Sequence, residues 1–243
     1  MVASLKHALE TGKLHIVFQP VVDLYAGGVF GYEALVRSRA PEFPDALSVV
    51  KAATDGRFMG QLGRALRRMA VDACPDHPLF LNIHPDEFDE GWLVRPDDSI
   101  SFHGHDVFLE ITESVPLSHY RHCHSVLAEI RRRGVKIAVD DLGAGYSNLK
   151  YIADLEPEVV KLDRELIANL VGETRLHRLV TSIVDLCGAQ GARVVAEGVE
   201  TPDELLAVID TGAQYAQGYF LAHPSSECQP VDLRLLLEEK AAV

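Results

Sequence analysis

The chain has 243 residues, of which 47% are hydrophobic and 24% charged, and its formal net charge is −13. This is an ordinary globular composition, and the negative field opposes non-specific attraction to DNA, RNA or an anionic membrane surface. No segment is apolar enough to cross a bilayer, and the cysteines lack the paired spacing of zinc ribbons or redox motifs. We therefore expect one domain over residues 1–243, residing in the cytoplasm with reduced thiols at Cys74, Cys123, Cys187 and Cys228.

Short β-rich runs alternate with helical patterns along the chain, as expected of βα units around a parallel sheet. The predicted strands cover residues 16–21, 29–36, 79–83, 107–111, 135–140, 159–162, 193–196 and 215–217. A final helix is expected over residues 231–240. The clearest helical face is formed by Leu176, Leu179, Val180, Ile183, Val184 and Cys187.

The connection between the first two predicted strands differs from the others. Residues 23–28 are too few for a crossover helix and are rich in turn formers, so these two strands should form a hairpin. One strand then runs antiparallel to its neighbours. We predict an α/β fold, a TIM (β/α)₈ barrel modified by one antiparallel strand.

Polar side chains stand at the carboxyl ends of these strands, where such barrels build their active sites. A single polar residue there more often caps a helix or meets water. Carboxylates from several strands on one rim, however, would repel one another unless cations bound them. Oxygen ligands with one amide suit Mg²⁺ or Mn²⁺ better than zinc. The polar residues are Glu33, Asn82, Glu110, Asp140, Asp141, Lys161, Glu197 and Gln217.

The adjacent pair Asp140 and Asp141 suits a centre with two metal ions, because one carboxylate can bridge while the other binds the second ion. Paired ions about 3.5–4 Å apart activate a bridging water and stabilise the attacking and leaving oxygens of phosphoryl hydrolysis. The pattern therefore favours metal-assisted hydrolysis of a phosphoester.

From about residue 5 to residue 224 the sequence resembles the EAL-domain cyclic di-GMP phosphodiesterases. The tripeptide Glu33-Ala34-Leu35 alone would be weak evidence for this resemblance, but it belongs to an ordered set of motifs. The resemblance implies hydrolysis of cyclic di-GMP to linear 5'-pGpG. The motifs are Phe18-Gln19-Pro20, Glu33-Ala34-Leu35-Val36-Arg37, Asn82, Glu110-Ile111-Thr112-Glu113, Asp140-Asp141, Lys161-Leu162-Asp163, Ala196-Glu197-Gly198-Val199-Glu200-Thr201 and Gln217-Gly218-Tyr219.

Carried over by position, the resemblance implies a role for each polar residue. Two ions, Mg²⁺ or Mn²⁺, would be bound, and Lys161 would contact the nucleophilic water. Glu197 has been cast both as metal ligand and as general base in this family. Gln217 would orient a ligand or water, and Gln19, Leu35 and Arg37 would contact the substrate. The first ion would be held by Glu33, Asn82, Glu110 and Asp140, and the second by Asp140, Asp141 and Glu197.

Residues 141–147 resemble the mobile loop that couples the metal site to dimerisation in this family, and Glu113 would anchor it. This chain has Leu142 and Ala144 where the family usually has Phe and Thr. A homodimer is expected, as is a separate sensory or regulatory partner. A stripe just beyond the loop would either face the second copy or pack on the barrel; its residues are Leu166, Ile167, Leu170 and Val171.

Two other functions remain open from the sequence. A catalytically silent EAL domain could act as a cyclic di-GMP receptor or protein-binding module, although all the expected metal-site side chains are retained. A glycosidase with two carboxylates would need no divalent ion. Two further features are weaker evidence of a function. Trp92 could stack on guanine. A cluster of histidines and a cysteine could bind a metal but matches no known zinc spacing; its residues are His119, His122, Cys123 and His124.

Overall fold

The computed structural model describes residues 2–89, 91–112, 120–144, 149–172 and 174–241. Its strands close into a barrel in chain order. The first strand, β1, pairs antiparallel with both β2 and β8, and every later neighbour pair is parallel. The predicted barrel with one reversed strand is confirmed. The strands are β1 (Leu14–Asp23), β2 (Val29–Ser38), β3 (Leu79–Asn82), β4 (Val107–Thr112), β5 (Lys136–Leu142), β6 (Val159–Leu162), β7 (Arg193–Ala196) and β8 (Tyr215–Ala216).

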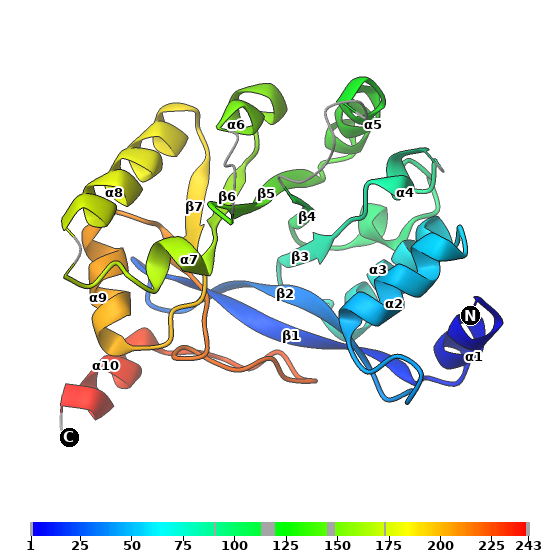
Figure 1. The fold of residues 1–243 in the computed structure, drawn as a ribbon, viewed down its shortest axis with the longest axis horizontal. Helices are drawn as coiled ribbons and strands as arrows, with labels where there is room; N and C mark the ends of the chain where they lie inside the picture. The colour runs from blue at the N-terminus through cyan, green and yellow to red at the C-terminus, as the bar shows by residue number, and fades with distance from the viewer. Residues whose placement is uncertain (1, 90, 113–119, 145–148, 173, 242–243) are drawn as a thin grey trace.

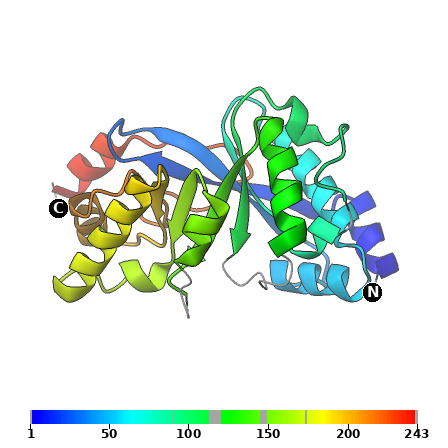
Figure 2. The same ribbon diagram turned by 90° about the horizontal axis from the view of Figure 1, so that it is seen from above.

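Helices surround the barrel and connect most strands (Figure 1). Two of them, α2 and α3, lie on the side nearest the N-terminus, while α8 and α9 lie on the opposite side, in both views (Figures 1 and 2). The predicted final helix is present. The helices are α1 (Val2–Glu10), α2 (Ala46–Asp55), α3 (Met59–Ala73), α4 (Asp86–Asp89), η1 (Ser99–Phe102), α5 (Tyr120–Arg132), α6 (Lys150–Leu155), α7 (Arg164–Ile167), α8 (Thr174–Ala189), α9 (Pro202–Asp210) and α10 (Leu233–Ala241).

Helix α8 packs on the barrel through a narrower face than the sequence predicts. Val180, Val184 and Cys187 are buried, as expected for residues at helical spacing. Leu179 is instead 51% exposed, so its assignment to the buried face is wrong. It precedes Val180 by one position, and one helical step of about 100° turns its side chain away from the core.

The stripe that follows β6 packs on the barrel. Ile167 and Leu170 are buried, and Leu166 packs against the same core. Only Val171 of the four residues is half exposed. The second interpretation of this stripe therefore holds, and the interpretation as a face for a second copy is wrong for Ile167 and Leu170.

The interior of the barrel has two layers. The lower layer is apolar, and within it the rings of Phe80 and Phe108 stack with their centroids 4.5 Å apart. Inward positions recur every second residue of a strand, so the next inward residue towards the active-site rim lies two positions further on. The apolar layer consists of Val21, Phe80, Phe108, Ala138, Val159, Val195 and Tyr215. The positions above it form the polar layer, and they are Gln19, Asn82, Glu110, Asp140, Lys161, Glu197 and Gln217.

Cys74, Cys187 and Cys228 are free thiols. Cys74 and Cys228 are 154 residues apart in the chain, yet the Cys228 thiol donates to Cys74 with 2.7 Å between the sulfur atoms. The spacing along the sequence gave no sign of this contact. Among the described helices, none combines the length and the apolar character that a bilayer span requires. Cytoplasmic residence stays a prediction.

The apolar layer should dominate the stability of the barrel. Phe108→Ala removes a fully buried ring, so the free energy of unfolding should fall by about 3–5 kcal/mol in urea denaturation. Phe102→Ala is the matched control, because Phe102 is 75% exposed and its loss should change little. Equal effects of the two substitutions would contradict the assignment of the apolar layer.

Candidate active site

Lys161 is the centre of the polar layer. It is the penultimate residue of β6 and almost fully buried, and its Nζ lies 2.7 Å from Glu110 Oε1 and 2.7 Å from Glu197 Oε1. Two more carboxylates lie within ion-pair distance, Asp140 Oδ1 at 3.2 Å and Glu33 Oε2 at 3.4 Å. Four predicted site carboxylates therefore converge on one ammonium group. Each comes from a different strand or from the residue that directly follows one.

The hairpin of β1 and β2 supplies a second set of contacts. Gln19 lies opposite Glu33 in the strand register. Gln217 donates through Nε2 to Glu33 Oε2 at 2.7 Å and to Gln19 Oε1 at 3.2 Å. Asn82 donates through Nδ2 to the other oxygen of Glu33 at 3.1 Å, which leaves Asn82 Oδ1 as a possible ligand atom. The reversed strand thus brings Gln19 into the same cluster as the parallel strands.

Asp140 and Asp141 point into the site from consecutive positions because the strand is irregular there. The β5–β6 register shifts between Val139 and Leu142, and Asp141 has φ of 60°, in the left-handed region. Asp is among the few residues other than Gly that tolerate this conformation. Ligand oxygens of Asp140, Asp141 and Glu197 lie within 4.8 Å of one another. The irregular strand end is what lets both aspartates reach one site.

Burial dominates the electrostatics of the carboxylates. It raises the pKa of Glu110 well above its usual range, that of Asp141 to about 6 and that of Glu197 to about 8, with neighbouring carboxylates adding to each shift. Burial would also raise the pKa of Glu33. The Lys161 ammonium and the hydrogen bonds from Gln217 and Asn82 outweigh burial there, so the pKa of Glu33 is lowered.

Burial acts on the pKa of Lys161 in the opposite direction to its effect on the carboxylates. Burial alone would lower its pKa, but the surrounding carboxylates, Asp140 and Glu110 foremost, raise that pKa well above its usual range. Lys161 is therefore a permanent ammonium with three donors and no acceptor. It can orient a water or an anion, but it cannot accept a proton.

The residues present fit a divalent metal centre. Four carboxylates surround a single ammonium, a fifth from Asp141 lies near two of them, and buried like charges of this kind favour an additional cation. Glu110 Oε2 and Gln217 Oε1 are buried and accept no hydrogen bond within the described residues. The donor set is carboxylate and amide oxygen, as Mg²⁺ and Mn²⁺ prefer.

Two cavities open beside this cluster and share Glu33 and Leu35 in their walls. The larger one has a volume of about 570 Å³, and Arg37, Asn82 and Asp141 line it. The smaller one has a volume of about 270 Å³. Its predicted lining residues include Gln19, Glu197 and Gln217. Three further lining residues, Asp163, Glu200 and Tyr219, lie in the sequence motifs but were assigned no role there, and Arg164 lies in none of them.

Other predicted features either lie outside the described residues or lie away from this cluster. Glu113, His119 and residues 145–147 of the predicted loop lie outside the described residues, as do the side chains of His122 and Cys123. His124 is exposed on α5. Trp92 lines neither cavity, and the guanidinium groups of Arg95 and Arg64 lie 3.9 Å and 5.6 Å from its ring centroid.

The fold and the site define a barrel with an acidic, metal-compatible centre at its mouth. The EAL domain family matches residues 2–224, and the chain belongs to this family. Cyclic di-GMP phosphodiesterase PA2567 of Pseudomonas aeruginosa is 34% identical over 92% of this chain and 40% of that protein.

The chain is also similar to solved structures of proteins in complex with cyclic di-GMP. BlrP1 of Klebsiella pneumoniae, in complex with manganese and cyclic di-GMP, has a TM-score of 0.78 and 27% identity, covering 90% of this chain and 58% of BlrP1. Another BlrP1 complex contains calcium. The PaMucR phosphodiesterase in complex with c-di-GMP has a TM-score of 0.80 and 26% identity, covering 92% of this chain and 96% of that chain. The chain spans less than two thirds of PA2567 and BlrP1.

The raised pKa values predict how metal binding depends on pH. Carboxylates must lose their protons to bind a cation, and the pKa is about 6 for Asp141 and about 8 for Glu197. The affinity for Mn²⁺, measured by calorimetric titration, should therefore rise from pH 6 to pH 8. Glu197→Gln should flatten the upper part of this rise. An affinity that is constant or falls with pH would contradict the assignment.

Proposed function

We propose that this chain hydrolyses one phosphodiester bond of cyclic di-GMP to give linear 5'-pGpG. The observation that carries this proposal is the convergence of four carboxylates on one ammonium, with Asp141 beside two of them and two cavities adjoining, in a barrel of the EAL family. Such a cluster is unfavourable as a purely structural element, because replacing buried ionic groups by apolar ones often stabilises a protein. Its retention is explained by cations bound during function.

Two divalent ions, Mg²⁺ or Mn²⁺, are proposed as cofactors. When bound, they would activate a water and stabilise the attacking and leaving oxygens. Asp140 would serve both ions, because its neighbour Asp141 turns towards Glu197 through the irregular end of β5. The first ion would be held by Glu33, Asn82, Glu110 and Asp140, and the second by Asp140, Asp141 and Glu197.

Lys161 and Glu197 would handle the nucleophilic water. Lys161 keeps its proton, so it would donate to the water oxygen and orient it. Glu197 would accept the proton of the water, because its Oε1 lies 2.7 Å from Lys161 Nζ and the bound cations would hold its carboxylate in the ionised form. One group thus orients the water and the other takes its proton.

The two cavities suit a ligand with two bases. Leu35 lies in the wall of both, so it would separate or support the two halves of a cyclic dinucleotide. Arg37 forms no ion pair within the described residues, and its planar guanidinium would bind a phosphate through two oxygens. Gln19 and Gln217 would contact the substrate from the smaller cavity.

Homodimerisation and a separate regulatory partner are also proposed, together with one domain over residues 1–243. The family match over residues 2–224 supports the last of these. Glu113 and the loop at residues 141–147 would couple the metal site to the dimer. No DNA or RNA partner is proposed, because the net charge of −13 opposes one.

One assay separates an enzyme from a receptor. The chain is incubated with cyclic di-GMP and Mg²⁺ or Mn²⁺, with and without EDTA, and the nucleotides are separated by chromatography. We expect 5'-pGpG to appear only with the metal. Binding of cyclic di-GMP without turnover in either metal would instead favour a silent receptor domain.

Removing proposed metal ligands should abolish turnover without unfolding the barrel. Glu33→Ala and Asp140→Ala each remove a carboxylate of the polar layer and leave the apolar layer intact. Hydrolysis should become undetectable, while circular dichroism and the cooperative unfolding transition remain. Near-normal turnover at limiting metal in either variant would refute the ligand assignment.

Lys161→Ala should lower kcat far more than it raises KM, because the proposed partner of Lys161 is the water and not the substrate. The loss should be about 10²–10³-fold, the usual cost of removing one donor from a charge-stabilising site. Arg37→Ala is the comparison, and it should mainly raise KM. A pure KM effect of Lys161→Ala would move Lys161 to a substrate-binding role.

A further inference from the structure

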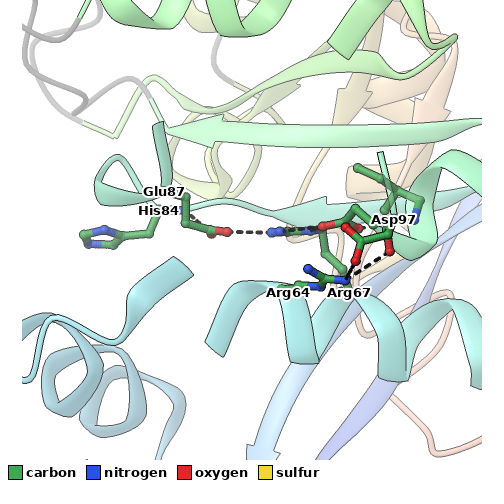
Figure 3. A network of polar contacts seen from close by, with 7 residues as sticks. Arg64, Arg67, His84, Glu87 and Asp97 are labelled. Atoms are coloured by element: carbon green, nitrogen blue, oxygen red, sulfur yellow. Dashed lines mark hydrogen bonds and ion pairs between the residues drawn. The ribbon is translucent and has the colours of Figure 1, made fainter. Parts of the chain in front are cut away.

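A second buried ionic cluster lies beside the active site. Arg67 of α3 donates through Nη1 to Glu87 Oε2 at 2.6 Å, and through Nη2 to Asp98 Oδ2 at 3.0 Å (Figure 3). The three side chains are 2%, 1% and 0% exposed, respectively. Two carboxylates are thus buried against one guanidinium, away from the proposed catalytic groups. A buried ionic cluster contributes little net stability, because desolvation of the charges offsets their attraction.

Glu87 uses both of its carboxylate oxygens. While Oε2 accepts from Arg67, Oε1 accepts from the backbone N–H of His84 at 3.1 Å. Figure 3 shows the Glu87 side chain directed towards Arg67 and the His84 ring directed away from it. The space is reserved for this carboxylate, because a Cβ on Gly63 would lie 2.2 Å from Glu87 Oε2. Glu87 therefore joins helix α3 to the chain that leaves β3.

That chain begins at Asn82, the proposed metal ligand. Asn82 is the last residue of β3, and the following Ile83 still donates through its N–H to Glu110 O at 3.1 Å. His84, two residues after Asn82, has left the sheet and is held by Glu87 instead. Arg67, Gly63 and Asn82 also line the same 570 Å³ cavity. The Glu87 contact is thus the first tie after the sheet ends.

We propose that Glu87, held in place by Arg67 and Asp98, is a positioning residue that fixes the backbone after β3 and so directs the Asn82 amide oxygen towards the bound cation. This inference rests on the proposed metal site. Asn82 is exposed, unlike Glu33 and Glu110, and the side-chain hydrogen bond that the described residues give it runs to Glu33, itself a proposed ligand. Its geometry therefore depends on the backbone that carries it. Residues around a ligand typically alter metal affinity about 10–100-fold when they are replaced.

The test measures Mn²⁺ binding by the full chain with Mn²⁺ alone, through the free-ion electron paramagnetic resonance signal. Glu87→Met removes both acceptors and should weaken Mn²⁺ binding about tenfold. Glu87→Gln keeps one acceptor of the two and should weaken it less. Asp97→Met is the matched control, because Asp97 pairs with Arg64 in the same region but its side chain is 66% exposed, and it should leave the affinity unchanged.

A double-mutant cycle separates positioning from general destabilisation. If Glu87 acts through Asn82, Glu87→Met should have no further effect on Mn²⁺ affinity when it is combined with Asn82→Ala. An equal loss in both backgrounds would overturn the inference. Should Glu87→Met fail to fold, Glu87→Gln carries the same cycle, and thermal unfolding of the metal-free variants verifies the fold.

The same titration distinguishes this inference from the proposed function. Normal Mn²⁺ binding by the unaltered chain together with unchanged binding by the folded Glu87 variants would overturn the positioning role alone. Failure of the unaltered chain to bind Mn²⁺ would overturn the metal site and the positioning role together.

Discussion

The buried ammonium of Lys161, with four carboxylates within 3.4 Å of Nζ, is the contact around which the rest of the molecule is arranged. Taking so many charges out of water is costly, and one ammonium compensates only part of the repulsion among the acids. Burial raises the pKa values of Glu110, Asp141 and Glu197, and the neighbouring carboxylates, which one ammonium does not neutralise, raise them further. A structure with this imbalance is suited to binding cations, because each ion relieves a repulsion already built into the fold.

The apolar layer in the lower half of the barrel stabilises the fold and so offsets the cost of the buried charges above it. The stacked Phe80 and Phe108 rings and their apolar neighbours fill the interior beneath the polar layer. Strand alternation then places one polar side chain two positions beyond each apolar one. The reversed β1 keeps the same layering, because Gln19 precedes Val21 in the chain and still lies above it in the barrel. The site is therefore a consequence of strand register, and a shift of one residue would bury the wrong side chains.

The strands and the main cluster could be read from the sequence because both follow local rules. Short β-rich runs located each strand within about two residues, and the short turn at residues 23–28 identified the reversed strand. The motifs that ended those strands marked the carboxylates and Lys161. What the sequence could not give depends on contacts between distant segments. The pairing of Arg67 with Glu87 and Asp98 has no local signal, and neither has the approach of Cys228 to Cys74. Leu179 was misassigned because periodicity fixes a helical face only to within about one residue.

The central claim, that the acids around Lys161 form a metal centre, is tested most directly by anomalous diffraction from crystals of the chain grown with Mn²⁺. The account predicts two manganese peaks in the polar layer, one near Glu33, Asn82, Glu110 and Asp140 and one near Asp140, Asp141 and Glu197. Anomalous density absent from this layer at saturating Mn²⁺, with the four carboxylates still paired only to Lys161, would contradict it.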